Sequence, residues 1–235
     1  MRSFGRCSAI ARRRTRSSAS SRWPAPSTCS RSTPSRCSTE RKCRAGGGDV
    51  PRLPNYTRRE GAPPELRDAW DAVAAERGGS VSGPWGVLLA SPPLAERGAR
   101  LGNYLRFGSL LGDAQRETAV LAAAREHNAR LAWASHVALA REAGVSERVI
   151  EAIGLRAPLE GLDEEAAEIV LYVRELVGAT RVSEPTFRAL RARLGERALV
   201  DLTGLLGYYA LVCYALNAFE IEPPEGSPRL PGPAD

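Results

Sequence analysis

The chain has 235 residues and a formal net charge of +6, a length that fits one large domain or one medium domain with a tail. The charge is divided unevenly. Residues 1–48 carry eleven Arg and one Lys against a single acid, a net charge of +11, whereas residues 49–235 carry 21 Arg and 26 acids, a net charge of −5. A nucleic-acid-binding domain should carry a basic face of its own, so we expect no nucleic-acid partner for the main domain.

Residues 1–50 are predicted to form a disordered Arg- and Ser-rich tail, because they lack apolar periodicity and the hydrophobic content of a core. Three interpretations stay open: a transit-like presequence, a polyanion-binding tail, or an extension from a start codon assigned too early. We favour the last, because 32 Arg against one Lys indicate a GC-rich gene. The four tail cysteines form no C-x-x-C pair, which is a weak zinc signal. No secretory apolar segment follows, so we expect a cytoplasmic protein.

From residue 64 onward, the sequence predicts a series of helices with Pro or a capping residue at most starts and Gly at several ends. The predicted starts are Pro64, Pro93, Asp113, Ala129, Ser146, Asp163, Ser183 and Arg197. In the second of these helices, Leu94, Leu101 and Leu105 are expected to face the core. No strand-like alternation follows residue 50. The predicted fold class is therefore all-α, a compact multi-helix bundle over residues 51–228 with a flexible C-terminus at 229–235.

The last predicted helix contains eighteen residues without a charge, between Asp201 and Glu220. That length reaches the lower limit of a membrane span. Gly, Thr, Tyr and Asn dilute the segment, however, and no polybasic flank sets an orientation. We therefore predict a buried core or subunit-interface helix and no membrane partner, with Cys213 as a small buried hydrophobic residue.

Glu117 and His136 are the candidate catalytic residues. They stand nineteen positions apart on two helices that are joined by a break at His127–Asn128. If the helices fold back on each other, the carboxylate can hold the imidazole in one tautomer and make it an acid/base group near neutral pH. The alternative is a solvated Glu in a first turn and a structural core His, and spacing alone favours that alternative.

The stretch around these residues resembles the carboxymuconolactone decarboxylase family, which includes the alkylhydroperoxidase D-type proteins. The elements that carry the resemblance are Glu117, Ala129, Ala132, Trp133, His136, Ala140, Ala143 and Gly144. The flanking segments GPWGVLLASPPLAERGARLGNYLRFGSLL and LTGLLGYYALVCYALNAFEIEPPEG also look like those of longer members, so the resemblance covers about residues 50–228. It implies an all-α, alkylhydroperoxidase D-like fold and tips the balance toward a functional pair at Glu117 and His136.

The departures from the family pattern matter for the chemistry. Ala129 and Ala132 stand where the peroxidase branch has its redox cysteines, so thiol peroxidase activity is disfavoured. The resemblance then implies decarboxylation or isomerisation of a small carboxylated ring or lactone. Trp133, Arg106 and Arg125 are the candidate substrate-binding residues, although an Arg on a solvated helix face is the alternative for either arginine.

Three functions from different classes therefore stay open: an acid/base lyase or isomerase, a non-catalytic helical ligand-binding or scaffold protein, and the disfavoured peroxidase. With two histidines and no close acidic pair, we predict no bound metal, and we predict no cofactor. The partner is expected to be a small-molecule substrate. The apolar last helix also suits a homo-oligomer, and the resemblance implies a dimer, trimer or hexamer.

Overall fold

The computed structural model describes residues 51–232, which belong to one compact unit of the chain. The predicted tail at residues 1–50 lies outside the described residues. Within residues 51–232 every regular element is helical, which confirms the predicted all-α class. The elements are η1 (Arg59–Gly61), η2 (Pro64–Leu66), α1 (Arg67–Glu76), α2 (Trp85–Leu88), α3 (Pro92–Asn103), η3 (Tyr104–Gly108), α4 (Asp113–Glu126), α5 (Arg130–Glu142), α6 (Glu147–Leu155), α7 (Glu164–Val173), η4 (Arg174–Gly178) and α8 (Glu184–Ala218).

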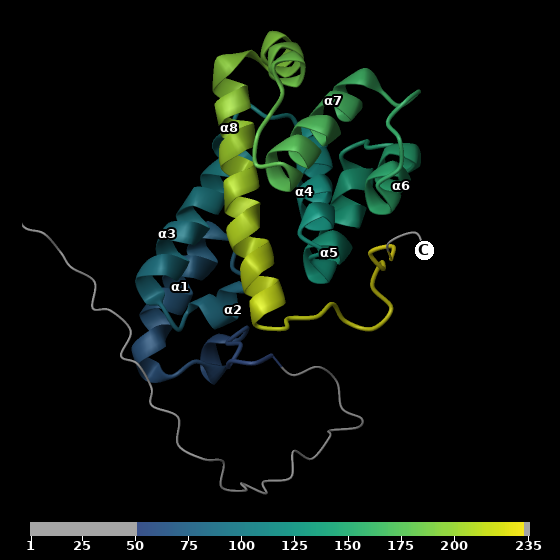
Figure 1. Cartoon of the computed structure of the whole chain (residues 1–235). Helices are drawn as coiled ribbons and strands as arrows, with labels where there is room; N and C mark the ends of the chain where they lie inside the picture. The colour runs from purple at the N-terminus through teal and green to yellow at the C-terminus, as the bar shows by residue number, and fades with distance from the viewer. Residues whose placement is uncertain (1–50, 233–235) are drawn as a thin grey trace, which may run out of the picture. The chain divides into compact units, whose positions relative to one another are not determined.

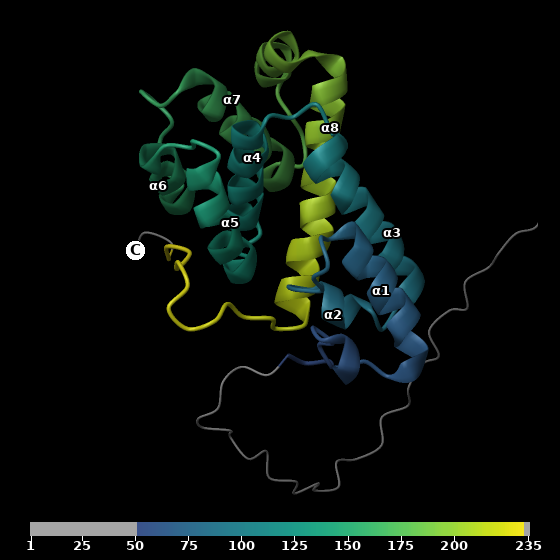
Figure 2. The ribbon, with the colours of Figure 1, turned by 180° about the vertical axis from the view of Figure 1, so that it is seen from behind.

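Two groups of helices lie on either side of the long helix α8 in both views of the domain (Figures 1 and 2). Helices α1 to α3 form one group, and α4 to α7 form the other, with α8 in contact with both α3 and α4. After α8, residues 219–232 cross beneath the second group (Figure 1). The core is continuous across these layers, and Trp85, Leu121 and Leu205 are among its fully buried side chains.

Helix α8 is a buried core helix, as the sequence predicted. Among the described residues, it is the one helix whose length and composition would suffice to cross a membrane, but most of its apolar window is buried inside the domain. Gly195, at φ +78°, interrupts its helical backbone close to the predicted end of one helix and start of the next. The thiol of Cys213 is fully buried within this helix.

The prediction that Leu94, Leu101 and Leu105 face the core was wrong in part. Leu105 is buried, but Leu94 and Leu101 are 43% and 48% exposed. The buried face carries small residues instead, among them Gly98 and Gly102. A methyl group on Gly102 would come within 2.1 Å of the Tyr208 hydroxyl oxygen, so this face is packed too closely against its neighbours to hold Leu.

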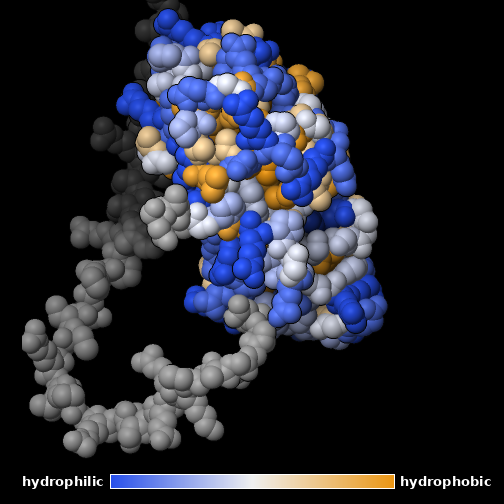
Figure 3. All heavy atoms as spheres, turned by 90° about the vertical axis from the view of Figure 1, so that its right-hand side faces the viewer, coloured by the Kyte–Doolittle hydropathy of each residue, from blue (hydrophilic) through white to orange (hydrophobic). Residues whose placement is uncertain are grey.

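The molecular surface on the α6–α7 side is mostly hydrophilic, with only small apolar areas among the described residues (Figure 3). Residues 229–232, which were predicted to belong to a flexible C-terminus, contact the domain. The carbonyl oxygen of Pro231 accepts a hydrogen bond of 2.9 Å from Nη1 of Arg125, and the Pro231 ring lies close to Gly154.

Candidate active site

Helices α4 and α5 bring Glu117 and His136 together. The chain reverses direction at His127 and Asn128, where the left-handed backbone of Asn128 (φ +50°) ends α4 and lets α5 start at Arg130. The predicted break is therefore confirmed at its predicted place. Because the helices then run back along each other, residues nineteen positions apart become neighbours. Glu117 is only 3% exposed, which excludes a solvated first-turn carboxylate.

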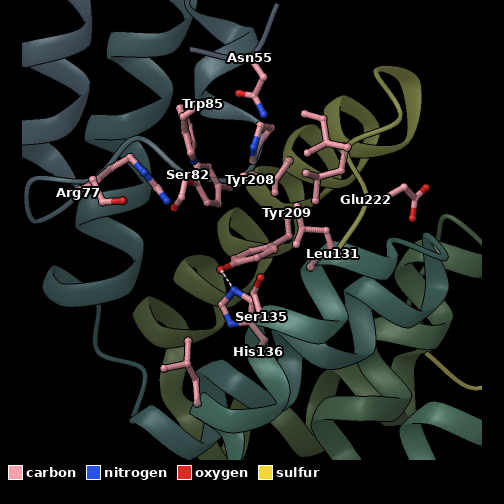
Figure 4. A pocket seen from close by; sticks show the side chains of 18 of the residues that line it. Asn55, Arg77, Ser82, Trp85, Leu131, Ser135, His136, Tyr208, Tyr209 and Glu222 are labelled. Atoms are coloured by element: carbon pink, nitrogen blue, oxygen red, sulfur yellow. Dashed lines mark hydrogen bonds between the residues drawn. The ribbon is translucent and has the colours of Figure 1, made fainter. Parts of the chain in front are cut away.

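A chain of hydrogen bonds runs from Glu117 through His136 to Tyr209. Nδ1 of His136 lies 2.6 Å from Oε2 of Glu117. Nε2 of His136 lies 3.1 Å from the hydroxyl oxygen of Tyr209, the contact that is dashed in Figure 4. A carboxylate only accepts hydrogen bonds, so Nδ1 donates to Glu117. In the neutral ring Nε2 is then an acceptor, and the Tyr209 hydroxyl donates to it. Burial raises the pKa of Tyr209, so its hydroxyl stays protonated.

Arg116 completes the surroundings of the carboxylate. Its Nε lies 3.3 Å from Oε1 of Glu117, and its Nη1 donates to the backbone oxygen of Arg106 at 3.0 Å. Burial alone would raise the pKa of Glu117, but the hydrogen bond and charge of His136, aided by the charge of Arg116, outweigh it and lower that pKa below its ordinary value. Glu117 is therefore ionised at neutral pH and stabilises positive charge on the imidazole.

His136 and Tyr209 open onto a cavity of about 590 Å³ between the helices. The residues that line it are Asn55, Arg77, Ser80, Ser82, Gly83, Pro84, Trp85, Arg106, Leu131, Ala132, Ser135, His136, Leu139, Tyr208, Tyr209, Val212, Leu216, Ile221, Glu222 and Pro224. Arg77 reaches toward the cavity from the side opposite Leu131 and Glu222, and His136 lies between these sides, close to Tyr209 (Figure 4). Such a volume fits a small organic molecule.

The five residues predicted for the site fall into three places. His136 and Arg106 line the cavity, and Glu117 lies behind His136. Trp133 does not line it, because its buried indole packs toward Gly154 on α6. Arg125 does not line it either, because its guanidinium is turned to the carbonyl oxygen of Pro231. The structure therefore gives these last two residues a packing role.

Two residues of the site were missed from the sequence. Tyr209 lies 73 positions after His136, and in the sequence it is one of several polar residues that interrupt an apolar run. Arg77 stands just before Gly78 and Gly79 at the end of α1, a place typical of a solvated helix terminus. Neither position carries a local signal, because only the packing of α1 and α8 around the cavity brings them to it.

The structure offers no redox pair at the expected positions. Ala129 and Ala132 are buried where the cysteines would be. Within residues 51–232, Cys213 is the only thiol, and burial raises its pKa to about 12, so it does not form a thiolate at neutral pH. The same residues contain no group of three or more His, Cys, Asp or Glu side chains that is arranged to hold a metal ion.

The fold and the site together define an all-α domain in which a buried carboxylate, an imidazole and a phenol form one chain beside a cavity. Residues 92–174 match the model of the Carboxymuconolactone decarboxylase family, which is the family that the sequence resembled. The matched segment includes Glu117 and His136 but ends before Tyr209 and begins after Arg77. No curated protein matches the chain.

Two solved structures share the fold. One is an uncharacterized peroxidase-related protein from a Silicibacter species, with a TM-score of 0.60 and 16% identity over 76% of this chain and 96% of that one. The other is a protein of unknown function from Agrobacterium tumefaciens, described as an AhpD antioxidant defence candidate. It has a TM-score of 0.52 and 20% identity over 59% of this chain and 97% of that one. At these identities the likeness concerns the fold alone, and it agrees with the predicted alkylhydroperoxidase D-like bundle.

Proposed function

We propose that the chain is an acid/base enzyme that decarboxylates or isomerises a small carboxylated ring or lactone. The observation that carries the proposal is the buried chain from Glu117 through His136 to Tyr209 at the wall of a cavity large enough for such a molecule. A structural histidine needs no ionised carboxylate and no cavity, whereas a general acid/base needs both a partner and access to the substrate.

In this proposal His136 moves the proton and Glu117 holds the charge. For isomerisation, the neutral Nε2 takes a proton from a substrate carbon, and the resulting imidazolium returns it at another carbon. For decarboxylation, His136 first takes up a proton from water and becomes the imidazolium. The bond to the carboxylate carbon then breaks, CO2 leaves, and the electron pair that stays on the ring carbon accepts this proton, which returns His136 to the neutral form. In either case the ionised Glu117 stabilises the imidazolium through Nδ1.

Tyr209 has a second role in the same proposal. Its hydroxyl occupies Nε2 of His136 in the free protein, and a substrate that takes over this nitrogen releases the hydroxyl. The phenol then donates to a carbonyl oxygen on which negative charge develops. Because burial raises the pKa of Tyr209, the hydroxyl remains a donor throughout the working pH range.

The resemblance to the alkylhydroperoxidase D-type proteins also suggests a thiol peroxidase, and the two structural neighbours are described as an antioxidant defence protein and a peroxidase-related protein. Two alanines at the expected cysteine positions and the buried, protonated Cys213 argue against that activity for the described part of this chain. We propose a cytoplasmic homo-oligomer that acts on a small molecule, without a cofactor.

The test is a turnover screen with lactone and ring carboxylates, followed by proton NMR in deuterated water. We expect loss of CO2 or deuterium incorporation with the wild-type chain, and a fall of more than about a hundredfold in His136→Ala and Glu117→Gln. Full activity of both variants on every accepted substrate would refute the proposal. Binding without any turnover would favour a non-catalytic ligand-binding protein. Peroxide consumption that is lost on thiol alkylation would favour the peroxidase.

A further inference from the structure

Two arginines at the cavity wall have no acidic partner. Arg77 and Arg106 both line the cavity that holds His136, and neither forms an ion pair with any acid among residues 51–232. The lining acid Glu222 is already paired with Arg130, at 2.7 Å. The guanidinium of Arg106 packs over the ring of Phe107 at 5.0 Å, which leaves its charge without an acid. The wall therefore carries two positive charges without an acidic partner, which is the charge pattern of an anion site.

Arg77 is held in place by aromatic packing rather than by charge. It follows the last residue of α1, and its guanidinium carbon lies 4.8 Å from the centre of the Trp85 ring. Its Nε is buried without a hydrogen-bond partner. Burial lowers the pKa of Arg77, and the charge of Arg106 contributes in the same direction. The Tyr208 side chain is a hydrogen-bond partner of the same guanidinium. Since a buried N–H group without an acceptor is costly, an anion that accepts from Nε would stabilise Arg77.

Arg106 is tied to the acid/base site through its backbone. It lies in η3, a π-helical turn, and its carbonyl oxygen accepts a hydrogen bond from Arg116, the residue that also contacts Glu117. Turns of this type often occur at functional sites because the extra residue redirects side chains. The backbone of Arg106 and the carboxylate behind His136 are thus fixed by the same guanidinium.

A continuous aromatic wall joins Arg77 to His136. The ring centres of Trp85 and Tyr208 lie 6.2 Å apart in a stacked arrangement. Tyr208 meets Tyr209 edge-on at 5.4 Å, and Tyr209 meets His136 in the same manner at 5.4 Å. An aromatic acid that enters the cavity can therefore contact these rings between the guanidinium and the imidazole.

We infer that Arg77 and Arg106 form an anion subsite that binds a carboxylate of a flat organic acid, while the body of the acid lies along Trp85 and Tyr208 with its reacting carbon at His136. Guanidinium groups match carboxylates in geometry as well as in charge. The carboxylate held there is not one that leaves as CO2, because decarboxylation removes the negative charge that the arginines stabilise. Arg77 and Arg106 are thus substrate-anchoring residues that act on affinity.

The location of the reacting carbon depends on the proposed function, whereas binding of the acid does not. The probes are 2-furoate, a flat carboxylate, and its uncharged methyl ester, each titrated into the full chain by ligand-observed NMR. We expect the wild-type chain to bind 2-furoate at least tenfold more tightly than the ester. No detectable binding of 2-furoate, or equal binding of acid and ester, overturns the subsite without the use of any variant.

The variants locate the subsite. Arg77→Gln and Arg106→Gln are each expected to weaken 2-furoate binding by roughly ten- to a hundredfold, as for the loss of a charge-assisted hydrogen bond, and to leave ester binding unchanged. Arg97, an exposed arginine of α3 that does not line the cavity, supplies the control Arg97→Gln, which should bind as the wild type does. Wild-type affinity in folded Arg77→Gln overturns the role of Arg77.

Two further results separate this inference from the proposed function. His136→Ala is expected to keep 2-furoate binding within a few-fold, because the imidazole lies at the other end of the wall. If Arg77-dependent binding holds but no substrate ever turns over, the acid/base proposal fails and the subsite stands. If turnover depends on His136 but neither KM nor acid binding changes in Arg77→Gln, the subsite fails and the acid/base proposal stands.

Discussion

The two histidines of the chain have the same aromatic contact but different hydrogen-bond partners. Each ring meets a tyrosine of α8 edge-on: His136 meets Tyr209 at 5.4 Å, and His127 meets Tyr214 at 5.1 Å. Only His136 has polar partners on both ring nitrogens. Nε2 of His127 is buried without a partner, and burial lowers the pKa of that imidazole although the charge of Glu126 raises it.

The aromatic contact is thus common to both histidines, and the polar partners distinguish them. His127 lies at the end of α4, where its backbone oxygen accepts a hydrogen bond from Asn217 at 2.8 Å, so its contribution is to the turn. His136 lies within α5, between an ionised acid and a buried phenol. A carboxylate on one nitrogen and a donor on the other are the surroundings that the proposed proton transfer by His136 requires.

The largest expected effect separates the two histidines by activity. His136→Ala should lower kcat on any accepted substrate by more than about a hundredfold, because the group that transfers the proton is gone. His127→Ala should retain kcat within a few-fold, since that ring does not line the cavity. Initial rates measured on both variants at one pH check this pair. An equal loss in the two variants would mean that folding, and not proton transfer, limits activity.

The next effect concerns the acids beside the two rings. Replacement of the 3%-exposed Glu117 by Gln should cost about 1–3 kcal/mol of unfolding free energy at pH 7, because it weakens a buried charge-assisted hydrogen bond. Glu126→Gln, beside His127, breaks a partly exposed ion pair with Arg156 and should cost less than about 1 kcal/mol.

The two acid variants should also differ in their response to pH. Because the folded pKa of Glu117 lies below its ordinary value of 4.5, the stability that the carboxylate contributes is complete above that pH and is lost as the pH falls through the folded pKa. Glu117→Gln should therefore lose less stability than the wild type on acidification below pH 4.5. Urea titrations at several pH values measure the difference, and parallel curves for the two proteins would contradict it.

The tyrosines supply a smaller contrast. Tyr209→Phe should lower kcat by about tenfold, the value of one neutral hydrogen bond, because the donor to Nε2 and to a developing oxyanion is lost. Tyr214→Phe should leave kcat unchanged, since Tyr214 is 62% exposed and does not line the cavity. Steady-state rates with a common substrate check both. An unchanged kcat in Tyr209→Phe would limit its role to packing.

Local sequence signals were enough to predict the helical fold, whereas they predicted only some of the site residues. Prolines, caps and glycines placed the helices within a few residues, and the Asn128 break was visible as a polar interruption. The buried face of α3 could not be predicted from the sequence, because its core positions are Gly and Ala, which carry little hydrophobic signal. Glu117 and His136 were found through the spacing of the family pattern.

The remaining site residues depend on tertiary packing. Tyr209 and Arg77 lie far along the chain on α8 and after α1, and no periodicity links them to His136. Conversely, Trp133 and Arg125 are close to His136 in sequence but project toward α6 and Pro231. Proximity in sequence is thus a poor guide to which side of a helix faces the cavity.

The smallest expected effect is a pH response at His127. Because burial lowers the folded pKa of His127 below 6.5, the unfolded chain takes up a proton first as the pH falls through 6.5. The stability that the neutral ring contributes is therefore complete above pH 6.5 and is lost at lower pH. His127→Gln, which cannot titrate, should flatten the stability curve between about pH 5 and pH 7 without a change in kcat at pH 7. Denaturant midpoints measured across this range check the prediction.

A wild-type curve of stability against pH that is already flat there would mean that His127 has the same pKa in the folded and unfolded chain. The contrast between the two histidines would then consist of their hydrogen-bond partners alone.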